Sequence, residues 1–290
     1  MRWVWMVGVT FPCTTPGRAQ VPQLPVVLGA PSASRVGGLN GAGVALVGDA
    51  GAVFLNPAGL ATIRHVAIEG SYRAVPLGAS LTSAALGWRL GQFDVGFGGR
   101  MLREGQVSGR RPWDGLAVGS LVYRWGMVAV GTSGKYLRRE RDGGRTYAVS
   151  GDVGLAVAVF DILAFAFAVQ NIGGNWQDTS SLALPTTTRL GFTMNYTDPQ
   201  EAFRLLSTME IQWRQGIATR GIVGLEAGMV VGAVGVLARA GYAGREDYIA
   251  SGKFTVGATV SLGWLDLDYA YRPDDIGGEI AHVFGLRMRR

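Results

Sequence analysis

The chain has 290 residues, of which 48% are hydrophobic and only 17% are charged, and it contains 45 glycines. Soluble globular domains average about 25% charged residues and about 7% glycine, so this composition is unusual for a cytosolic enzyme. Intrinsic disorder is excluded because it requires low hydrophobicity and high charge. The formal net charge of +6 is spread along the chain, whereas nucleic-acid binding requires a clustered basic face. We therefore expect no nucleic-acid partner.

Few residues belong to the types that carry catalysis or bind metals. Cys13 is the only cysteine, and His65 and His282 are the only histidines. A single cysteine forms neither an internal disulfide nor a zinc cluster. No serine-containing nucleophile motif accompanies the two histidines. We predict that the chain is not an enzyme, has no catalytic residues and binds no metal or cofactor.

The first residues are typical of an export signal. Arg2 is followed by an apolar run from Trp3 to Phe11, and Ala19 offers a small residue at a cleavage point. This pattern predicts a secretory signal peptide at residues 1–19. The alternative is an apolar N-terminus without a role in export.

An N-terminal plug is predicted at residues 20–62, because residues 30–62 do not alternate between apolar and polar residues. It contains the glycine-rich stretch Val36–Val47, followed by Asn56-Pro57-Ala58-Gly59-Leu60. No Gly-Lys-Ser/Thr follows the glycines, so we do not expect a phosphate-binding loop. Small residues let a backbone pack closely inside a narrow lumen, and Pro57 fixes a turn after Asn56. A gating role and a purely structural filling both fit this plug.

The rest of the chain alternates with a period of two residues. From Lys253 to Leu262, every second residue is apolar and those between are polar or small, which is the pattern of a strand with one apolar face. Counted in this way, the sequence contains about fourteen strands of about nine to thirteen residues each. They are expected to start near His65, Leu81, Gln92, Asp114, Met127, Arg145, Asp161, Thr187, Ala202, Arg220, Ala233, Gly252, Leu265 and Ile280.

The connections between these strands alternate between two lengths. Short turns such as Leu90-Gly91 alternate with longer polar loops such as Glu104–Pro112, Arg139–Gly144 and Asn171–Pro185. Short turns at one end and long loops at the other are typical of transmembrane β-barrels, and strands of about nine to eleven residues suit a tilted bilayer crossing. A soluble β-sandwich would also alternate, but it explains neither the strand length nor the loop asymmetry. We predict an all-β protein with a 14-stranded antiparallel transmembrane β-barrel at residues 63–290.

The two faces of the alternation have opposite characters. We expect Phe192, Ile211, Phe254 and Val256 to face lipid, so that an arginine at Val256 blocks assembly while one at Thr255, on the other face, is tolerated. Opposite charges confined in the lumen are expected to pair and to leave no wide pore. The charged residues predicted to face the lumen are Glu69, Arg73, Asp94, Arg100, Asp152, Arg189, Arg204, Glu210, Arg214, Glu226 and Arg239.

Two motifs carry a resemblance to a known family. The stretch Asp49–Ala61, which ends in Asn56-Pro57-Ala58-Gly59-Leu60-Ala61, resembles the N-terminal hatch of the FadL-like outer-membrane proteins. The glycine-rich Val36–Val47 stretch and the closing Asp268–Arg287 segment are similar to the PorV/PorQ branch of that superfamily. The resemblance implies a fourteen-stranded barrel in the outer membrane, with an N-terminal plug and a periplasmic N-terminus.

The resemblance implies two different functions. PorV and PorQ relatives serve type IX secretion, so we expect an accessory role in protein export or surface attachment. Its partners would be outer-membrane lipid together with secretion-channel subunits or exported cargo. The alternative is a FadL-like channel for uptake of hydrophobic small molecules, because FadL relatives pass hydrophobic compounds through the barrel wall.

Overall fold

The computed structural model describes residues 24–74, 78–105, 111–141, 144–160, 162–173, 184–197, 202–215, 217–244, 252–273 and 279–290. The predicted signal peptide at residues 1–19, residues 20–23 of the predicted plug and most of the predicted Asn171–Pro185 loop lie outside these ranges. Within them, no helix combines the length and the apolar character that a membrane-crossing helix needs.

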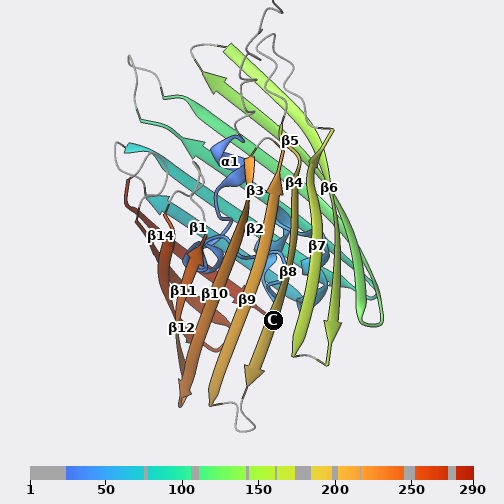
Figure 1. Cartoon of the computed structure of the whole chain (residues 1–290), viewed down its shortest axis with the longest axis vertical. Helices are drawn as coiled ribbons and strands as arrows, with labels where there is room; N and C mark the ends of the chain where they lie inside the picture. Colours follow the sequence, from blue (N-terminus) through green and yellow to red (C-terminus); the bar gives the residue numbers. More distant parts are fainter. Residues whose placement is uncertain are drawn as a thin grey trace, which may run out of the picture.

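Across the described ranges, fourteen antiparallel strands form one closed barrel, in which each strand pairs with its sequence neighbours and β1 pairs with β14. Figure 1 shows that the strands are strongly tilted and surround a common interior. The predicted fourteen-stranded antiparallel barrel is therefore confirmed. The strands are β1 (Val66–Ala74), β2 (Ser80–Leu90), β3 (Phe93–Arg103), β4 (Trp113–Trp125), β5 (Val128–Arg141), β6 (Gly144–Val159), β7 (Leu163–Ile172), β8 (Thr187–Thr197), β9 (Phe203–Arg214), β10 (Ile217–Val231), β11 (Val234–Ala243), β12 (Phe254–Leu262), β13 (Leu265–Arg272) and β14 (Ala281–Arg289).

The strand starts lie close to the predicted ones. The largest difference is at β10, which begins at Ile217 rather than Arg220. The predicted loop Arg139–Gly144 is wrong in its bounds, because β5 continues to Arg141 and pairs there with Gly144 at the start of β6. Charged side chains end the apolar pattern near the ends of these strands, but they do not end the backbone pairing.

Burial alternates along the strands as a barrel requires. Ile211 and Phe254 are exposed on the outer face, and Phe192 and Val256 lie half-buried on the same face. Thr255 faces inward and is fully buried, and its hydroxyl group donates a hydrogen bond to the carbonyl oxygen of Gly38 at 3.0 Å. The expectation that Thr255 tolerates an arginine is therefore wrong, because the N-terminal part of the chain covers this position.

The N-terminal segment, which here means residues 24–62, packs against the inner wall of the barrel. Figure 1 shows it in blue, surrounded by the strands. It contains the helices α1 (Val26–Gly29) and α2 (Ser34–Gly38) and the 3₁₀ helices η1 (Ala50–Phe54) and η2 (Pro57–Thr62). Helices this short are not stable alone in water. Their stability comes from buried apolar contacts with the wall, such as those that join Val53 to Leu102 and Leu60 to Val122 in common clusters.

Candidate functional site

The Asn56-Pro57 turn fastens the N-terminal segment to β6. The side-chain amide of Asn56 donates hydrogen bonds to the carbonyl oxygens of Val44 at 3.1 Å and of Leu155 at 3.3 Å, and its carbonyl group accepts from the backbone N–H of Ala58. Pro57 opens η2, at a helix position where proline's missing N–H costs nothing. The other residues of the predicted motif, Ala58, Gly59 and Leu60, are buried within η2.

Two glycines of the wall allow this close approach. A Cβ atom at Gly154 of β6 would overlap with the side-chain oxygen of Asn56. A Cβ atom at Gly131 of β5 would lie 2.7 Å from the backbone nitrogen of Ala58. Glycine within a strand often marks such an approach by another backbone. The turn motif and the glycines of β5 and β6 therefore form one matched contact.

Two charged residues of the N-terminal segment bind both each other and the wall. Arg35 Nη1 lies 2.7 Å from Asp49 Oδ2, and Arg35 Nη2 lies 3.0 Å from Glu226 Oε1 in β10. Asp49 Oδ1 lies 2.7 Å from Arg287 Nη1 in β14. Burial by itself raises the pKa of Asp49, but the guanidinium groups of Arg35 and Arg287 outweigh burial and hold the pKa below its ordinary value. Burial likewise lowers the pKa of Arg35, and Asp49 and Glu226 more than reverse that effect.

These contacts close into a ring through β11 and β13. Arg239 Nε lies 3.2 Å from Glu226 Oε2, and Arg239 Nη1 lies 3.1 Å from Asp268 Oδ1. Arg287 Nε lies 2.6 Å from Asp268 Oδ2, which completes the circuit back to Asp49. We call these six residues the charge ring: Arg35, Glu226, Arg239, Asp268, Arg287 and Asp49. Cations and anions alternate around it, so every buried charge has partners of opposite sign, as stable burial of charge requires.

A second group of predicted lumen charges holds the glycine-rich stretch. Arg189 Nη1 of β8 lies 2.6 Å from Glu210 Oε1 of β9. The other carboxylate oxygen of Glu210 accepts hydrogen bonds from the backbone N–H groups of Gly43 at 2.7 Å and Val44 at 2.9 Å. A carboxylate that accepts two backbone N–H groups fixes the position of that backbone.

A third group contacts both ends of the N-terminal segment. Glu69 of β1 accepts a hydrogen bond from the backbone N–H of Gly51 at 2.7 Å. Arg100 of β3 donates through Nη1 to the carbonyl oxygens of Val27 and Ala30, both at 3.0 Å. Since β9 lies across the barrel from β1 and β3, these contacts and those of Glu210 bond the segment to strands on opposite sides of the barrel.

The remaining predicted lumen charges are also on the inner wall. Asp94 of β3 lies 2.7 Å from Arg124 Nε, and Asp152 of β6 lies 2.7 Å from Lys135 Nζ. Three more predicted residues complete the set: Arg73 and Arg214 are buried, and Arg204 is partly exposed. All the residues predicted from their position in the alternation lie on the same side of the wall, but in several separate groups.

Arg35 and Asp49 are site residues that the sequence analysis missed. They are the only charged residues between residues 24 and 62. Two lone opposite charges in an otherwise small and apolar segment signal buried ion pairing. The sequence could therefore have indicated that both seek partners, although not which strands supply them.

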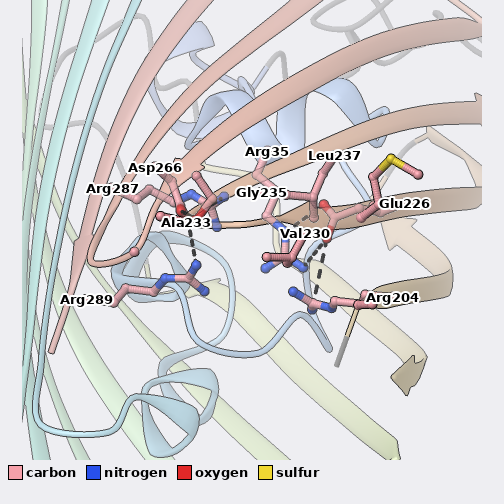
Figure 2. Close-up of a pocket in the computed structure, with 15 residues that line it drawn as sticks. Arg35, Arg204, Glu226, Val230, Ala233, Gly235, Leu237, Asp266, Arg287 and Arg289 are labelled. Atoms are coloured by element: carbon pink, nitrogen blue, oxygen red, sulfur yellow. Dashed lines mark hydrogen bonds and ion pairs between the residues drawn. The ribbon is translucent and has the colours of Figure 1, made fainter. Parts of the chain in front are cut away.

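A cavity of about 250 Å³ remains open between the charge ring and the short-turn end of the barrel. Val230 and Leu237 supply apolar surface to it. Figure 2 shows Arg35 and Arg204 both directed at Glu226. Around the same cavity, Asp266 pairs with Arg287 at 3.3 Å and with Arg289 at 2.5 Å. Val230 is 51% exposed although it belongs to the inward-facing set, because nothing in the N-terminal segment covers it.

The two histidines lie away from this cavity. His65 is exposed just before β1, and His282 is exposed on the outer face, where its Nδ1 lies 2.8 Å from the hydroxyl oxygen of Tyr269. Among the described residues, no group of three or more His, Cys, Asp or Glu side chains is arranged to hold a metal ion.

Comparisons with known proteins identify the fold. No family model matches the chain, and no curated protein matches it. A structure described as the CymD monoaromatic hydrocarbon channel has a TM-score of 0.60 and 12% identity, covering 91% of this chain and 98% of that one. The Pseudomonas putida toluene transporter TodX has a TM-score of 0.58 and 12% identity, covering 93% and 100%. A Pseudomonas aeruginosa FadL homologue has a TM-score of 0.55 and 11% identity, covering 88% and 97%.

At this level of identity, the likeness shows the fold alone. The chain therefore has the barrel fold of FadL-family outer-membrane channels, as the hatch-like motif implies. These matches do not bear on the PorV/PorQ branch, and that part of the resemblance stays a prediction.

Proposed function

We propose that this protein is an outer-membrane channel for small hydrophobic molecules, in which the N-terminal segment acts as the plug. The observation that carries the proposal is the partly apolar cavity beside the charge ring, within a lumen that the N-terminal segment otherwise fills. Its volume of about 250 Å³ is slightly below the ~300–1,000 Å³ usual for drug-sized ligands. A molecule about the size of a single ring fits this space.

The named neighbours support the same class of substrate. CymD is described as a monoaromatic hydrocarbon channel and TodX as a toluene transporter. In this chain, Val230 and Leu237 offer such a molecule an apolar surface. The neighbouring charges are paired with one another, so an uncharged molecule passes without breaking an ion pair.

The loop pattern supports an orientation for the barrel. Short turns lie on the periplasmic side of outer-membrane barrels and long loops on the outside. The cavity lies among the short-turn ends of β9 to β14, so in this orientation it is the last position before release into the periplasm. Leu24 and Val27, at the start of the described N-terminal segment, pack with Leu102 near the long-loop end of β3. The periplasmic N-terminus therefore stays a prediction that this orientation does not support.

The accessory role in protein export, with secretion-channel subunits or exported cargo as partners, stays an untested prediction. The loop on which it chiefly rests, Asn171–Pro185, lies mostly outside the described residues. No contact of the described residues favours export over the channel, so we do not adopt it.

Filling the cavity with a bulky side chain tests whether molecules pass through it. Leu237→Trp places an indole group in the cavity, and Val236→Trp places the same group on the lipid-facing side of the same strand. In proteoliposomes with equal amounts of folded protein, we expect Leu237→Trp to slow toluene entry severalfold and Val236→Trp to leave it unchanged. Equal rates for the wild type and Leu237→Trp would contradict the proposed route.

A further inference from the structure

A groove of about 420 Å³ lies on the outer wall across β2 to β5, toward the long-loop end of the barrel. Small residues form its floor: Gly99 pairs with Ala117 across β3 and β4, and Gly115 lies one step above, opposite Met101. A Cβ atom at Gly115 would lie 2.8 Å from the ring of Trp113, so glycine is needed where the indole group lies over the floor. Met101, Trp113 and Tyr136 form apolar sides. We call this feature the outer groove.

Arginines surround the upper end of the outer groove. The Arg138 guanidinium group lies 5.1 Å from the centre of the Trp113 ring and 3.2 Å from Glu140. Arg103 pairs directly with Trp113 in the sheet register and is exposed. Arg145 lies 3.5 Å from Glu140, with a side chain that is 71% exposed. Three arginines beside one glutamate leave this end of the groove positively charged.

These arginines face outward, toward the surroundings of the barrel rather than the lumen. Arg138 is two residues beyond the exposed Tyr136 in β5, and Arg103 is two residues beyond the exposed Met101 in β3, so each shares its neighbour's face. A lipid site needs an apolar surface for acyl chains and cations for an anionic headgroup. The outer groove supplies the apolar surface, and the arginines at the edge of the membrane supply the cations.

We propose that the outer groove binds a phosphorylated membrane lipid, with an acyl chain along its glycine floor and the phosphate group against Arg103, Arg138 and Arg145. This inference rests on the membrane location in the proposed function but not on any transported molecule. Guanidinium groups bind phosphate oxygens in a bidentate manner. The cation–π contact with Trp113 holds the Arg138 guanidinium group over the mouth of the groove.

Native mass spectrometry of the detergent-solubilised full chain tests the site, with phosphatidylglycerol as the probe. We expect the wild type to retain one phosphatidylglycerol in preference to a diacylglycerol with the same chains. Arg138→Gln should weaken retention about fivefold, the usual effect of one arginine at an anionic lipid surface. Ala117→Leu fills the floor and should weaken retention while all three arginines remain. Inorganic phosphate should not displace the lipid, since it does not fill the groove.

Two matched variants keep the test decisive. Arg64→Gln removes an exposed arginine at the other end of the barrel, and Ala258→Leu enlarges an exposed residue on the outer face of β12. Both should retain phosphatidylglycerol like the wild type. Equal weakening in Arg64→Gln would show a general charge effect, and unchanged retention in Ala117→Leu would show that the groove is not the site. Either result overturns the proposal and leaves the channel function untouched, since toluene entry is measured separately. A heat-modifiable shift in gel mobility shows that each variant is folded.

Discussion

Removing Arg35 tests whether the charge ring holds the N-terminal segment to the wall. In Arg35→Met, Asp49 and Glu226 each lose a guanidinium partner, at 2.7 and 3.0 Å respectively. Each acid keeps at least one arginine, because Arg287 lies 2.7 Å from Asp49, and Arg239 and Arg204 lie 3.2 and 4.0 Å from Glu226. Removing one partner of a buried ion pair costs about 3–5 kcal/mol. Since neither acid is left unpaired, we expect about 3 kcal/mol.

Hydrogen exchange of residues 33–56 in proteoliposomes measures this loss, because exchange reports the free energy of local opening. A cost of about 3 kcal/mol corresponds to exchange about a hundredfold faster, at 1.4 kcal/mol for each factor of ten. The amides of the strands should keep their protection, because the backbone pairing of the barrel does not involve Arg35. Methionine preserves most of the apolar volume, so the change isolates the charge.

A matched control and a second variant make the test strict. Arg64→Met removes an exposed arginine just before β1 and should not alter exchange in residues 33–56. Arg35→Met combined with Glu226→Gln should cost less than the sum of the two single changes, by about 0.5–3 kcal/mol, because the two side chains are in contact. Unchanged exchange in Arg35→Met, or strict additivity in the double variant, would refute the idea that the ring holds the segment.

Three more predictions concern the outer face of the barrel, the Asn56-Pro57 turn and the charge ring. Leu225→Arg, on the outer face, should cost about 2–4 kcal/mol at mid-membrane and reduce folding into liposomes, whereas Val230→Arg, in the cavity, should fold normally. Gly154→Ala should displace the buried amide above it and cost about 1–3 kcal/mol in thermal unfolding; Gly134→Ala, which has open space around it, should cost nothing comparable. The pKa of Asp49 is lower in the folded state than the ordinary aspartate value of about 3.9, so ionised Asp49 stabilises the folded state at pH values above about 3.9. This stabilisation is lost as the pH falls through the pKa that Asp49 has in the folded state. Exchange protection of residues 33–56 should therefore stay level from neutral pH to about 5 and fall below about 4, and Asp49→Asn should reduce the size of that fall.

The barrel could be predicted from the sequence because each strand carries its own evidence. The period-two pattern of a segment such as Lys253–Leu262 needs no knowledge of its partners. It also shows which side of the wall a charge such as Glu210 or Glu226 occupies, and both are buried inside. Strand ends were less predictable where polarity and pairing disagree, as at Arg139–Arg141, which still pair with β6.

The groupings inside the lumen could not be predicted in the same way. Arg35 and Glu226 are 191 residues apart, and Asp49 and Arg287 are 238 residues apart. Such contacts depend on the height and rotation at which the N-terminal segment settles in the closed barrel, and alternation carries no information on either. Thr255 shows the same limit, because its position on the inner face was evident but the segment that covers it was not.

The charge ring also predicts that part of the N-terminal segment can be removed without loss of the barrel. Deleting residues 33–56 takes away two ring members and leaves Glu226, Arg239, Asp268 and Arg287, which stay connected in that order by ion pairs of 3.2, 3.1 and 2.6 Å. Two cations and two anions remain, so these four charges keep partners of opposite sign when water fills the lumen. We therefore expect the deletion variant to insert and to show a normal heat-modifiable shift. If the segment is the plug, the variant should admit small sugars in a liposome-swelling assay that the intact protein excludes. Insertion without any gain in permeability would mean that the segment serves the structure alone, and failure to insert would mean that the wall depends on contacts outside the ring, such as those of Glu210 with the glycine-rich stretch.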